Sequence, residues 1–325
     1  MLKTILVTGS SGFIGSVLVQ DLLEKNYKVI GVDLIPSHIL HKNFTPYILD
    51  LTKKDVLNIL NFFSKDIYSV CHLAAKIRVD ESMIDPGLYY EHNITATNNL
   101  LIWCKNNNIL NILFASTAAV YGTPLDTPIK GYIETQAGDP VSVYGKTKLI
   151  CENLINDFHI AHNFRGYIFR FFNVCGGSES NHDKPLHIIP IIVNNIIHGK
   201  DIQIFGSNYN TKDGTCVRDY IHLKDISNGF ILAIERGFEI NDIKIYNLGS
   251  EEGFSVKEII YKCLEIFDKI HPNYIQKIKI INSNRRLGDF DTLIADNSLC
   301  KKELNWNIKY NLDDIITDTI NSFNY

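Results

Sequence analysis

Short, nearly continuous apolar segments recur through the first half of the chain. They lie at residues 4–8, 28–33, 69–73, 109–116 and 166–171. Each is rich in Ile, Val, Leu or Phe and lacks the polar alternation of a strand that faces water on one side. Such segments are typical of parallel strands that are buried on both faces. We therefore expect a parallel sheet with helices on each side.

Between these segments the apolar residues follow helical spacing, most clearly at residues 17–23, 88–106 and 144–162. Strands that alternate with helices predict a doubly wound α/β fold of the Rossmann type. We expect this domain to span residues 1–172. Beyond it the alternation becomes irregular.

The second half, residues 173–325, is predicted to form a smaller C-terminal lobe, parts of which return to the first domain. Its segments 176–185, 206–214 and 282–291 are polar and rich in turn-forming residues, and are predicted to be loops. The chain of 325 residues is long enough for two such units.

Composition narrows the class of protein. The chain is 45% hydrophobic and 21% charged, with a net charge of -4, and no Lys/Arg run exceeds two residues. These values are typical of a globular protein and argue against a nucleic-acid surface or an anionic-membrane patch. No apolar run approaches the ~18 residues of a membrane span. Residues 1–8 are predicted to be a strand, not a secretion signal.

Cysteine usage indicates a reducing compartment. The seven cysteines are scattered singly, with no C-x-x-C pair and no Cys/His cluster. Such cysteines are expected to be small buried hydrophobes, neither disulfide partners nor metal ligands. We expect a cytoplasmic protein with no metal site.

A glycine-rich turn follows the first predicted strand. Residues 8–15 are T-G-S-S-G-F-I-G, which places Gly9, Gly12 and Gly15 three apart. A strand that turns tightly into a helix needs glycine where the backbone approaches a pyrophosphate. The helix N-terminus then offers N–H groups and partial positive charge to the phosphates. The turn predicts a dinucleotide site.

An acidic residue supports that prediction. Asp33 ends the second predicted strand, where a carboxylate can accept hydrogen bonds from the adenosine ribose. It would repel a 2′-phosphate, so the sequence favours NAD over NADP as the cofactor.

Tyr144 and Lys148 lie four residues apart in a predicted helix and so share one face. A tyrosine has an ordinary pKa of about 10. A nearby ammonium and the positive nicotinamide of NAD+ would lower it, so that the phenolate could act as a general base. Thr117, at the end of the segment I-L-F-A-S-T, is the candidate hydroxyl that relays the proton. A Tyr/Lys pair alone also occurs on many solvated helices; its position after a nucleotide-binding half favours chemistry.

Several motifs carry a resemblance to a known family. In the first half they are T-G-S-S-G-F-I-G, H-L-A-A at 72–75, S-T-A-A-V-Y-G at 116–122 and Y-G-K-T-K at 144–148. In the second half they are R-F-F-N at 170–173, D-G-T-C-V-R-D-Y-I-H at 213–222, Y-N-L-G at 246–249, R-R-L-G-D at 285–289 and E-L-N-W at 303–306. Over essentially its whole length the chain resembles the extended short-chain dehydrogenase/reductase family. The second-half motifs are similar to the members that epimerise UDP-hexoses at C4.

The resemblance implies an isomerase that interconverts UDP-glucose and UDP-galactose by transient, NAD-dependent oxidation at C4 through a 4-keto intermediate. It implies that residues 1–172 bind NAD and residues 173–325 bind the UDP-sugar. Tyr144 would be the acid/base, Lys148 would bind the nicotinamide ribose and tune Tyr144, and Thr117 would be the hydroxyl partner. Dimers built through a helix bundle are common in the family, and the apolar positions of 88–106 and 144–162 fit a homodimer.

The resemblance also assigns two sets of contacts. The expected cofactor contacts are Gly9, Gly12, Phe13, Ile14, Gly15, Asp33, Asp50, Leu51, Leu73, Ala74, Asn93, Tyr144, Lys148 and Phe172. The expected UDP-sugar contacts are Thr117, Asn173, Ile188, Gln203, Phe205, Arg218, Arg286, Asp289 and Leu293. Two arginines suit a diphosphate, an aromatic and an aliphatic residue suit the faces of uracil, and Asp289 suits a ribose.

The sequence departs from the family pattern at two places. A lysine that often contacts the cofactor is replaced by Ile77, with Lys76 one position earlier. Leu293 stands where many members carry a tyrosine that restricts the pocket to plain hexoses. Leucine is smaller, so interconversion of UDP-GlcNAc and UDP-GalNAc, alone or in addition, is an alternative.

Two further alternatives belong to other classes. A nucleotide-sugar 4,6-dehydratase needs an acidic pair after the active-site threonine, where this chain has Ala118 and Ala119. A non-catalytic NAD-sensing protein could share the fold, because fold does not imply function. Loss of Tyr144 or Lys148 would favour it, and both are present.

Overall fold

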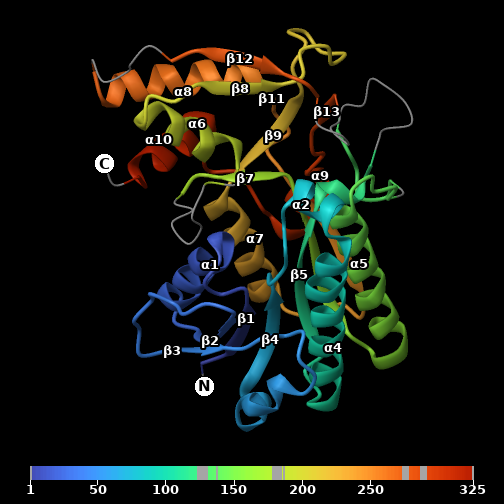
Figure 1. The fold of residues 1–325 in the computed structure, drawn as a ribbon. Helices are drawn as coiled ribbons and strands as arrows, with labels where there is room; N and C mark the ends of the chain where they lie inside the picture. Colours follow the sequence, from blue (N-terminus) through green and yellow to red (C-terminus); the bar gives the residue numbers. More distant parts are fainter. Residues whose placement is uncertain are drawn as a thin grey trace.

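The structure is a computed structural model. It describes residues 2–122, 131–136, 138–177, 185, 187–272, 278–285 and 291–323. A large parallel sheet with helices on both faces forms the lower part of the molecule in Figure 1, and a smaller lobe lies above it. Among the described residues, no helix is both long and apolar enough to cross a membrane.

The central sheet has seven strands, all of which pair in parallel. In spatial order they are β10 (Ile243–Leu248), β6 (Arg165–Phe171), β5 (Asn111–Thr117), β4 (Ile67–His72), β1 (Thr4–Thr8), β2 (Lys28–Asp33) and β3 (Phe44–Ile48). The strand order reverses between β1 and β4, and a crevice at such a point is where open α/β sheets bind their ligands.

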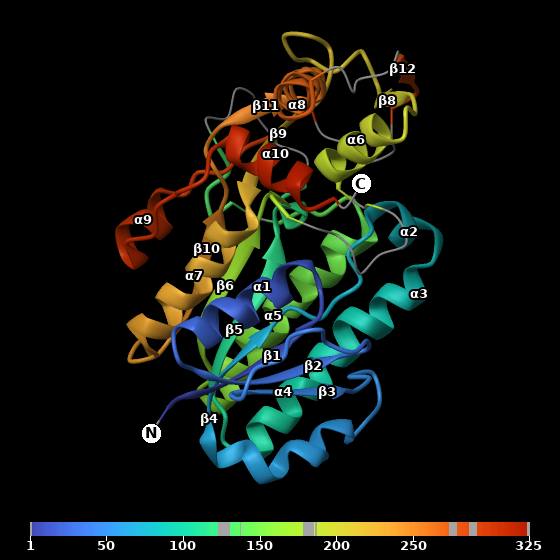
Figure 2. The same ribbon diagram turned by 90° about the vertical axis from the view of Figure 1, so that its left-hand side faces the viewer.

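Helices cover both faces of this sheet (Figures 1 and 2). One face carries α1 (Phe13–Glu24), α7 (Leu223–Arg236) and α9 (Ser298–Leu304). The other carries the 3₁₀ helix η1 (Val56–Asp66), α4 (Ala96–Asn106) and α5 (Val143–His162). The side chains of each strand alternate between the two cores, as Ile5 and Val7 pack on the α1 side and Leu6 on the α4 side. The predicted Rossmann-type doubly wound sheet is confirmed.

The smaller lobe has its own apolar core, formed between its helices and short strands. Its helices are α6 (Ile188–Ile197), α8 (Val256–Ile270) and α10 (Leu312–Asn321). Its strands are β7 (Asn173–Cys175), β8 (Ile202–Phe205), β9 (Val217–His222), β11 (Gly253–Ser255), β12 (Ile280–Ser283) and β13 (Thr292–Leu293). Strand β10 and helices α7 and α9, although late in the sequence, belong to the large sheet and its cover. Residues 173–325 therefore contribute to the large sheet and its cover as well as to the smaller lobe.

The predicted strands match β1, β2, β4, β5 and β6 to within two or three residues. The predicted helix at 88–106 is not one regular α-helix. Its path runs through α3 (Pro86–Tyr89), a π-helical turn η2 (Tyr90–Thr95) and α4, preceded by the short helix α2 (Val79–Ile84). A π turn shifts the register of the side chains that follow it, and such turns are frequent at functional sites.

Candidate active site

The glycine turn packs tightly against the end of β4. Gly9 has φ +71°, and a Cβ placed there would lie 2.7 Å from the backbone nitrogen of Ala74. A Cβ on Gly15 would lie 1.9 Å from the carbonyl oxygen of Gly9. Neither position therefore tolerates a side chain without movement of backbone atoms.

The N-terminus of α1 suits a phosphate. Gly12 is its N-cap residue and supplies no side-chain cap, and its first turn contains no acidic residue. The N–H groups of Phe13 and Ile14 begin the helix at this end, where the helix dipole favours an anion. The donor set and the close-packed glycine backbone fit the pyrophosphate of a dinucleotide.

Asp33 fixes the turn to the end of β2. One carboxylate oxygen accepts the N–H of Ser11 at 2.8 Å, and the other accepts those of Leu34 at 2.7 Å and Ile35 at 3.3 Å. A carboxylate has about four lone-pair positions, so it retains room for a ribose hydroxyl. The negative charge beside the turn also agrees with the predicted preference for NAD.

The ends of β1 and β4 are joined by a buried polar cluster. The N–H of Leu73 donates to Thr8 O at 3.1 Å, and that of Ala74 donates to Thr8 Oγ1 at 3.3 Å. His72 bridges Thr8 Oγ1 at 2.7 Å and Thr97 Oγ1 at 2.9 Å. Burial, assisted by the charge of Lys148, lowers the pKa of His72 to about 3, so this histidine is a neutral structural bridge.

Asp50 and Leu51 follow β3 at the same sheet edge. The Asp50 carboxylate accepts the N–H of Thr52 at 3.0 Å and its hydroxyl at 2.7 Å. The side chain of Asn99 on α4 donates to Leu51 O at 2.9 Å. The loop is thus anchored beside the expected adenine end of the site, and cofactor contacts from these two residues remain a prediction.

Thr117, Tyr144 and Lys148 come together where β5 ends and α5 begins. Thr117 is the last residue of β5, and its hydroxyl accepts the N–H of Ala119 at 3.2 Å. The same side chain lies near the phenol of Tyr144 and acts on its pKa. Tyr144 is the second residue of α5, and helical side chains lean toward the N-terminus, so its phenol lies at the positive end of the helix dipole.

Burial disfavours both the phenolate form of Tyr144 and the charged ammonium of Lys148. Burial raises the pKa of Tyr144 to about 12, although the side chain of Thr117 lowers it. Lys148 is 3% exposed, and burial lowers the pKa of its ammonium to about 8. Its Nζ donates to Ala115 O at 2.9 Å and lies 4.8 Å from the centre of the Phe114 ring. At neutral pH the lysine is mostly charged while the tyrosine keeps its proton, so a further positive charge is needed to make the phenol a base.

A buried ion pair lies one turn beyond Lys148. Glu152 accepts two hydrogen bonds from Arg170, at 3.1 Å from Nε and 2.7 Å from Nη2, and both side chains are about 5% exposed or less. Ser116, next to Thr117, also donates to Glu152. The pair ties α5 to the ends of β5 and β6. We did not predict it from the sequence, although the i, i+4 spacing of Tyr144, Lys148 and Glu152 could have indicated it.

Asn93, an expected cofactor contact, uses its amide within the protein. Its Oδ1 accepts the N–H of Lys76 at 2.8 Å, and its Nδ2 donates to Lys76 O at 3.1 Å and to Thr147 Oγ1 at 2.9 Å. Asn93 therefore fixes the backbone of Lys76, whether or not it also meets the cofactor. Ile77, at the position of the missing lysine, is 37% exposed.

Phe172 and Leu293 lie together, close to Thr117 in the fold. They belong to one buried cluster that also contains Ala118 and Tyr132, and Leu293 is 8% exposed. Leu293 on β13 is paired in register with Arg218 on β9. The structure thus brings one expected cofactor contact, Phe172, and three expected sugar contacts, Thr117, Leu293 and Arg218, into one neighbourhood.

The remaining expected sugar contacts lie in or beside the smaller lobe. Asn173 begins β7, and its Nδ2 donates to Asp219 O at 3.1 Å. Ile188 is the first residue of α6, and Gln203 and Phe205 lie on β8. Arg286 and Asp289 lie outside the described residues. The contacts of these residues with UDP remain a prediction.

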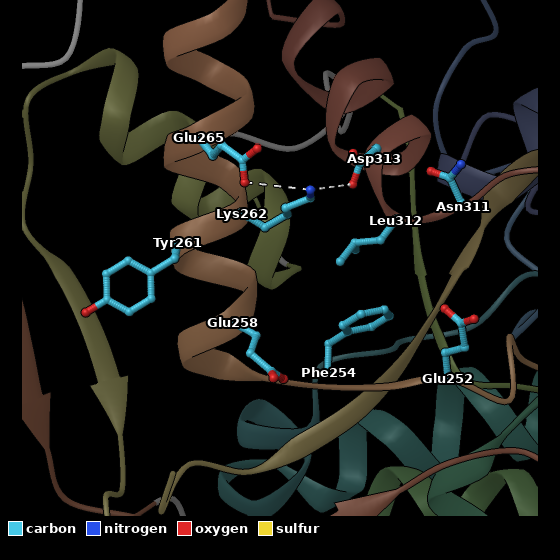
Figure 3. Close-up of a pocket in the computed structure, with 9 residues that line it drawn as sticks. All are labelled: Glu252, Phe254, Glu258, Tyr261, Lys262, Glu265, Asn311, Leu312 and Asp313. Atoms are coloured by element: carbon cyan, nitrogen blue, oxygen red, sulfur yellow. Dashed lines mark ion pairs between the residues drawn. The ribbon is translucent and has the colours of Figure 1, made fainter. Parts of the chain in front are cut away.

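A separate pocket of about 700 Å³ lies between α8 and α10 (Figure 3). Its wall includes Phe254, Tyr261 and Leu312, and Lys262 lies 3.1 Å from Asp313 and 3.7 Å from Glu265. It shares no residue with the candidate active site. Within the described ranges, no group of three or more His, Cys, Asp or Glu side chains could hold a metal ion.

Known proteins are similar to this chain over nearly its whole length. Residues 5–249 match the model of the NAD dependent epimerase/dehydratase family. A UDP-glucose 4-epimerase of Halalkalibacterium halodurans is 35% identical over 314 residues, covering 94% of this chain and 91% of that protein. The structure is similar to UDP-glucose 4-epimerase from Bifidobacterium longum in complex with NAD+ and UDP, with 33% identity, a TM-score of 0.86 and 98% of each chain covered. It is also similar to the UDP-Glc/GlcNAc 4-epimerase from Campylobacter jejuni, with 30% identity, a TM-score of 0.81 and 98% of each chain covered.

The buried ammonium generates a stability prediction. Burial lowers the pKa of Lys148 from 10.5 to about 8, which means that the charged ammonium destabilises the folded state. This destabilisation is fully present below the pKa of the folded state. A pKa shift of this size corresponds to about 3 kcal/mol of destabilisation, which a neutral side chain would remove. Such a side chain would also lose the hydrogen bond to Ala115, which costs about 1–2 kcal/mol. Lys148→Met should therefore raise the free energy of unfolding by about 1–2 kcal/mol at about pH 7.

The gain should shrink as the pH rises from about 8 toward 10.5, because the unfolded lysine then loses its proton as well. Denaturant unfolding of the native protein and of Lys148→Met at several pH values measures this difference in the free energy of unfolding. A variant that is less stable than the native protein at pH 7, or a difference that does not change with pH, would contradict the assigned burial cost.

Proposed function

The chain belongs to the NAD dependent epimerase/dehydratase family, and from that premise we propose that it is an isomerase that converts UDP-glucose and UDP-galactose into each other by NAD-dependent epimerisation at C4. The observation that carries the proposal is the group at the start of α5. The phenol of Tyr144 lies near Thr117, which acts on its pKa, and Lys148 lies one turn further along the same helix. This group stands at the carboxyl ends of parallel strands, beside a glycine turn that fits a dinucleotide.

In the proposed reaction Tyr144 takes the proton from the sugar 4-OH. The glycine turn and Asp33 would hold NAD+, which would accept the hydride from C4 and supply the positive charge that the buried phenol needs. Thr117 holds the phenol oxygen and orients the sugar hydroxyl, and Lys148 stabilises the phenolate. The 4-keto sugar then turns its other face to the site, the hydrogen returns to C4, and Tyr144 gives its proton back to O4.

UDP provides the binding energy that retains the keto sugar while it turns. We assign it to the smaller lobe, through Asn173, Ile188, Gln203, Phe205 and Arg218, with Arg286 and Asp289 completing the set. Arg218 is supported by its place beside Leu293, which lies in the cluster next to Thr117. Remote contacts to UDP and few to the hexose leave the sugar free to rotate.

The direct test is conversion of UDP-galactose, with the products separated, by protein loaded with NAD+. Tyr144→Phe removes the acid/base and should lower the rate by at least ~100-fold, because general acid–base catalysis typically contributes that much. Tyr261→Phe, a matched change at a tyrosine 61% exposed in the other lobe, should leave the rate unchanged. A native protein that converts neither UDP-galactose nor UDP-GalNAc would rule the epimerase out. A fully active Tyr144→Phe variant would rule out the assigned base.

Leu293 supports a second candidate function, the interconversion of UDP-GlcNAc and UDP-GalNAc. The leucine is buried beside Phe172 and Ala118, where a tyrosine would fill more of the space near the sugar. The similar enzyme of Campylobacter jejuni is described as a UDP-Glc/GlcNAc 4-epimerase, which is consistent with a bifunctional site on this fold.

Replacing Leu293 by tyrosine should separate the two activities. The larger side chain should reduce turnover of UDP-GalNAc by at least ~10-fold while UDP-galactose is converted within about threefold of the native rate. Leu293→Met conserves volume and should keep the native ratio. If the native protein converts UDP-galactose alone, or if both activities fall equally in the tyrosine variant, Leu293 does not select the sugar.

We also place the protein in the cytoplasm as a homodimer. All seven cysteines are buried and none forms a disulfide, as expected in a reducing compartment. Tyr90 on η2 is 43% exposed, Ile102 on α4 41% and Ile160 on α5 73%. Exposed apolar side chains on two adjacent helices suit a helix-bundle contact with a second copy.

The homodimer predicts a solution mass twice that of one chain. Ile102→Glu should shift the protein toward monomers, because it places a charge in the apolar contact. Tyr261→Glu, at an exposed position in the other lobe, is the control and should leave the mass unchanged. Sedimentation or light scattering measures both. A native protein that is monomeric at high concentration would refute the homodimer.

A further inference from the structure

Ser82 makes a contact to the catalytic helix that no motif in the sequence indicates. This serine lies on α2, with 0% of its surface exposed. Its hydroxyl donates a hydrogen bond to Val79 O at 2.6 Å and accepts one from the backbone N–H of Tyr144 at 3.1 Å. One buried hydroxyl thus connects α2 with the first turn of α5.

The backbone N–H of Tyr144 needs a partner from outside its own helix. The first N–H groups of a helix have no intrahelical acceptor. In α5 the side chain of Ser142 accepts the N–H of Gly145 at 3.0 Å, and the first regular helical bond runs from Lys146 N to Ser142 O at 3.0 Å. Ser82 satisfies the N–H of Tyr144, which the N-cap residue does not reach.

The carbonyl of Tyr144 is held as well. The hydroxyl of Thr147 donates to Tyr144 O at 2.8 Å and accepts from Asn93 Nδ2 at 2.9 Å. Asn93 in turn forms hydrogen bonds with the N–H and the carbonyl of Lys76, two residues beyond the expected cofactor contact Ala74. Both peptide groups of Tyr144 are therefore tied to the segment 76–95, which follows the cofactor side of the site.

We propose that Ser82 is a positioning residue for the proton transfer by Tyr144. It fixes the backbone of the tyrosine against the segment that leaves the cofactor site, and so holds the phenol in reach of Thr117. The inference rests on the proposed function for its kinetic consequences. The hydrogen bond itself can be tested without any ligand or activity.

The physical consequence concerns the phenol more than the fold. Without the Ser82 hydroxyl the first turn of α5 loses a cap, and the phenol moves from its place near Thr117 and the helix N-terminus. The Thr117 hydroxyl and the positive end of the helix both favour the phenolate. Their loss raises the pKa of Tyr144, so less phenolate is present to act as a base. A displacement of about 1 Å in a catalytic group can cost up to ~100-fold in rate.

The experiment compares Ser82→Ala with a matched control, Ser69→Ala. Ser69 lies in β4, is also 0% exposed, and its hydroxyl has no hydrogen-bond partner among the described residues. Ser82→Thr keeps the hydroxyl and serves as the rescue variant. Two readouts are taken: exchange of the backbone amides at the start of α5 in the cofactor-free protein, and kcat and KM for UDP-galactose from neutral to alkaline pH.

In Ser82→Ala the Tyr144 amide should exchange at least ~10-fold faster, while the amides in the middle of α5 keep their native rates. kcat should fall about 10-fold at neutral pH with KM within twofold, and the deficit should shrink as the pH rises. Ser69→Ala should match the native protein in both readouts, and Ser82→Thr should recover most of kcat.

Native exchange at Tyr144 in Ser82→Ala would overturn the inference even if the enzyme proves to have another substrate. A kcat deficit that is the same at every pH, or one that Ser69→Ala shares, would also overturn it, because either would indicate a general loss of folded protein. If the native protein lacks epimerase activity, the proposed function fails, and the exchange measurement still decides the role of Ser82.

Discussion

The structure depends on keeping a positive charge and a phenol inside a nearly dry site. Lys148 and Tyr144 are both disfavoured in their charged forms by burial, which moves the pKa of the lysine down to about 8 and that of the tyrosine up to about 12. The protein partly offsets this with the carbonyl of Ala115 on Lys148 and the hydroxyl of Thr117 on Tyr144. In the proposed function the Tyr144 phenol is therefore a poor base until a cationic cofactor binds beside it, which couples the chemistry to the occupied state.

The residues around Lys148 and Tyr144 are arranged to support these two buried groups. Glu152 lies one turn beyond Lys148 and helps to keep the ammonium charged, and Arg170 neutralises Glu152 through a two-point contact. Breaking such a pair by removing one partner leaves an uncompensated buried charge, typically at a cost of about 3–5 kcal/mol. The parallel sheet supplies the frame, because the carboxyl ends of β1, β4 and β5 meet at one edge, where the glycine turn, Ala74 and Thr117 converge.

Sequence patterns predicted the features of the structure that depend on residues close together in the chain. The buried strands at 4–8 and 28–33 and the i, i+4 placement of Tyr144 and Lys148 depend on nearest neighbours along the chain, and they lie where expected. The π turn at η2 was not predictable, because apolar spacing does not resolve one inserted residue. Neither was the contact of Ser82 with Tyr144, whose partners are 62 residues apart. The return of β10 and α7 to the large sheet depends on tertiary packing in the same way.

The most direct test of the central claim follows the hydrogen at C4. Protein loaded with NAD+ is given UDP-galactose that carries deuterium at C4, in ordinary water, and the product is examined by mass and by NMR. If the hydrogen leaves C4 and returns to it within one closed site, the UDP-glucose formed should carry the deuterium at C4. Replacement of the label by hydrogen from water, in a protein that does form UDP-glucose, would contradict transient oxidation at C4.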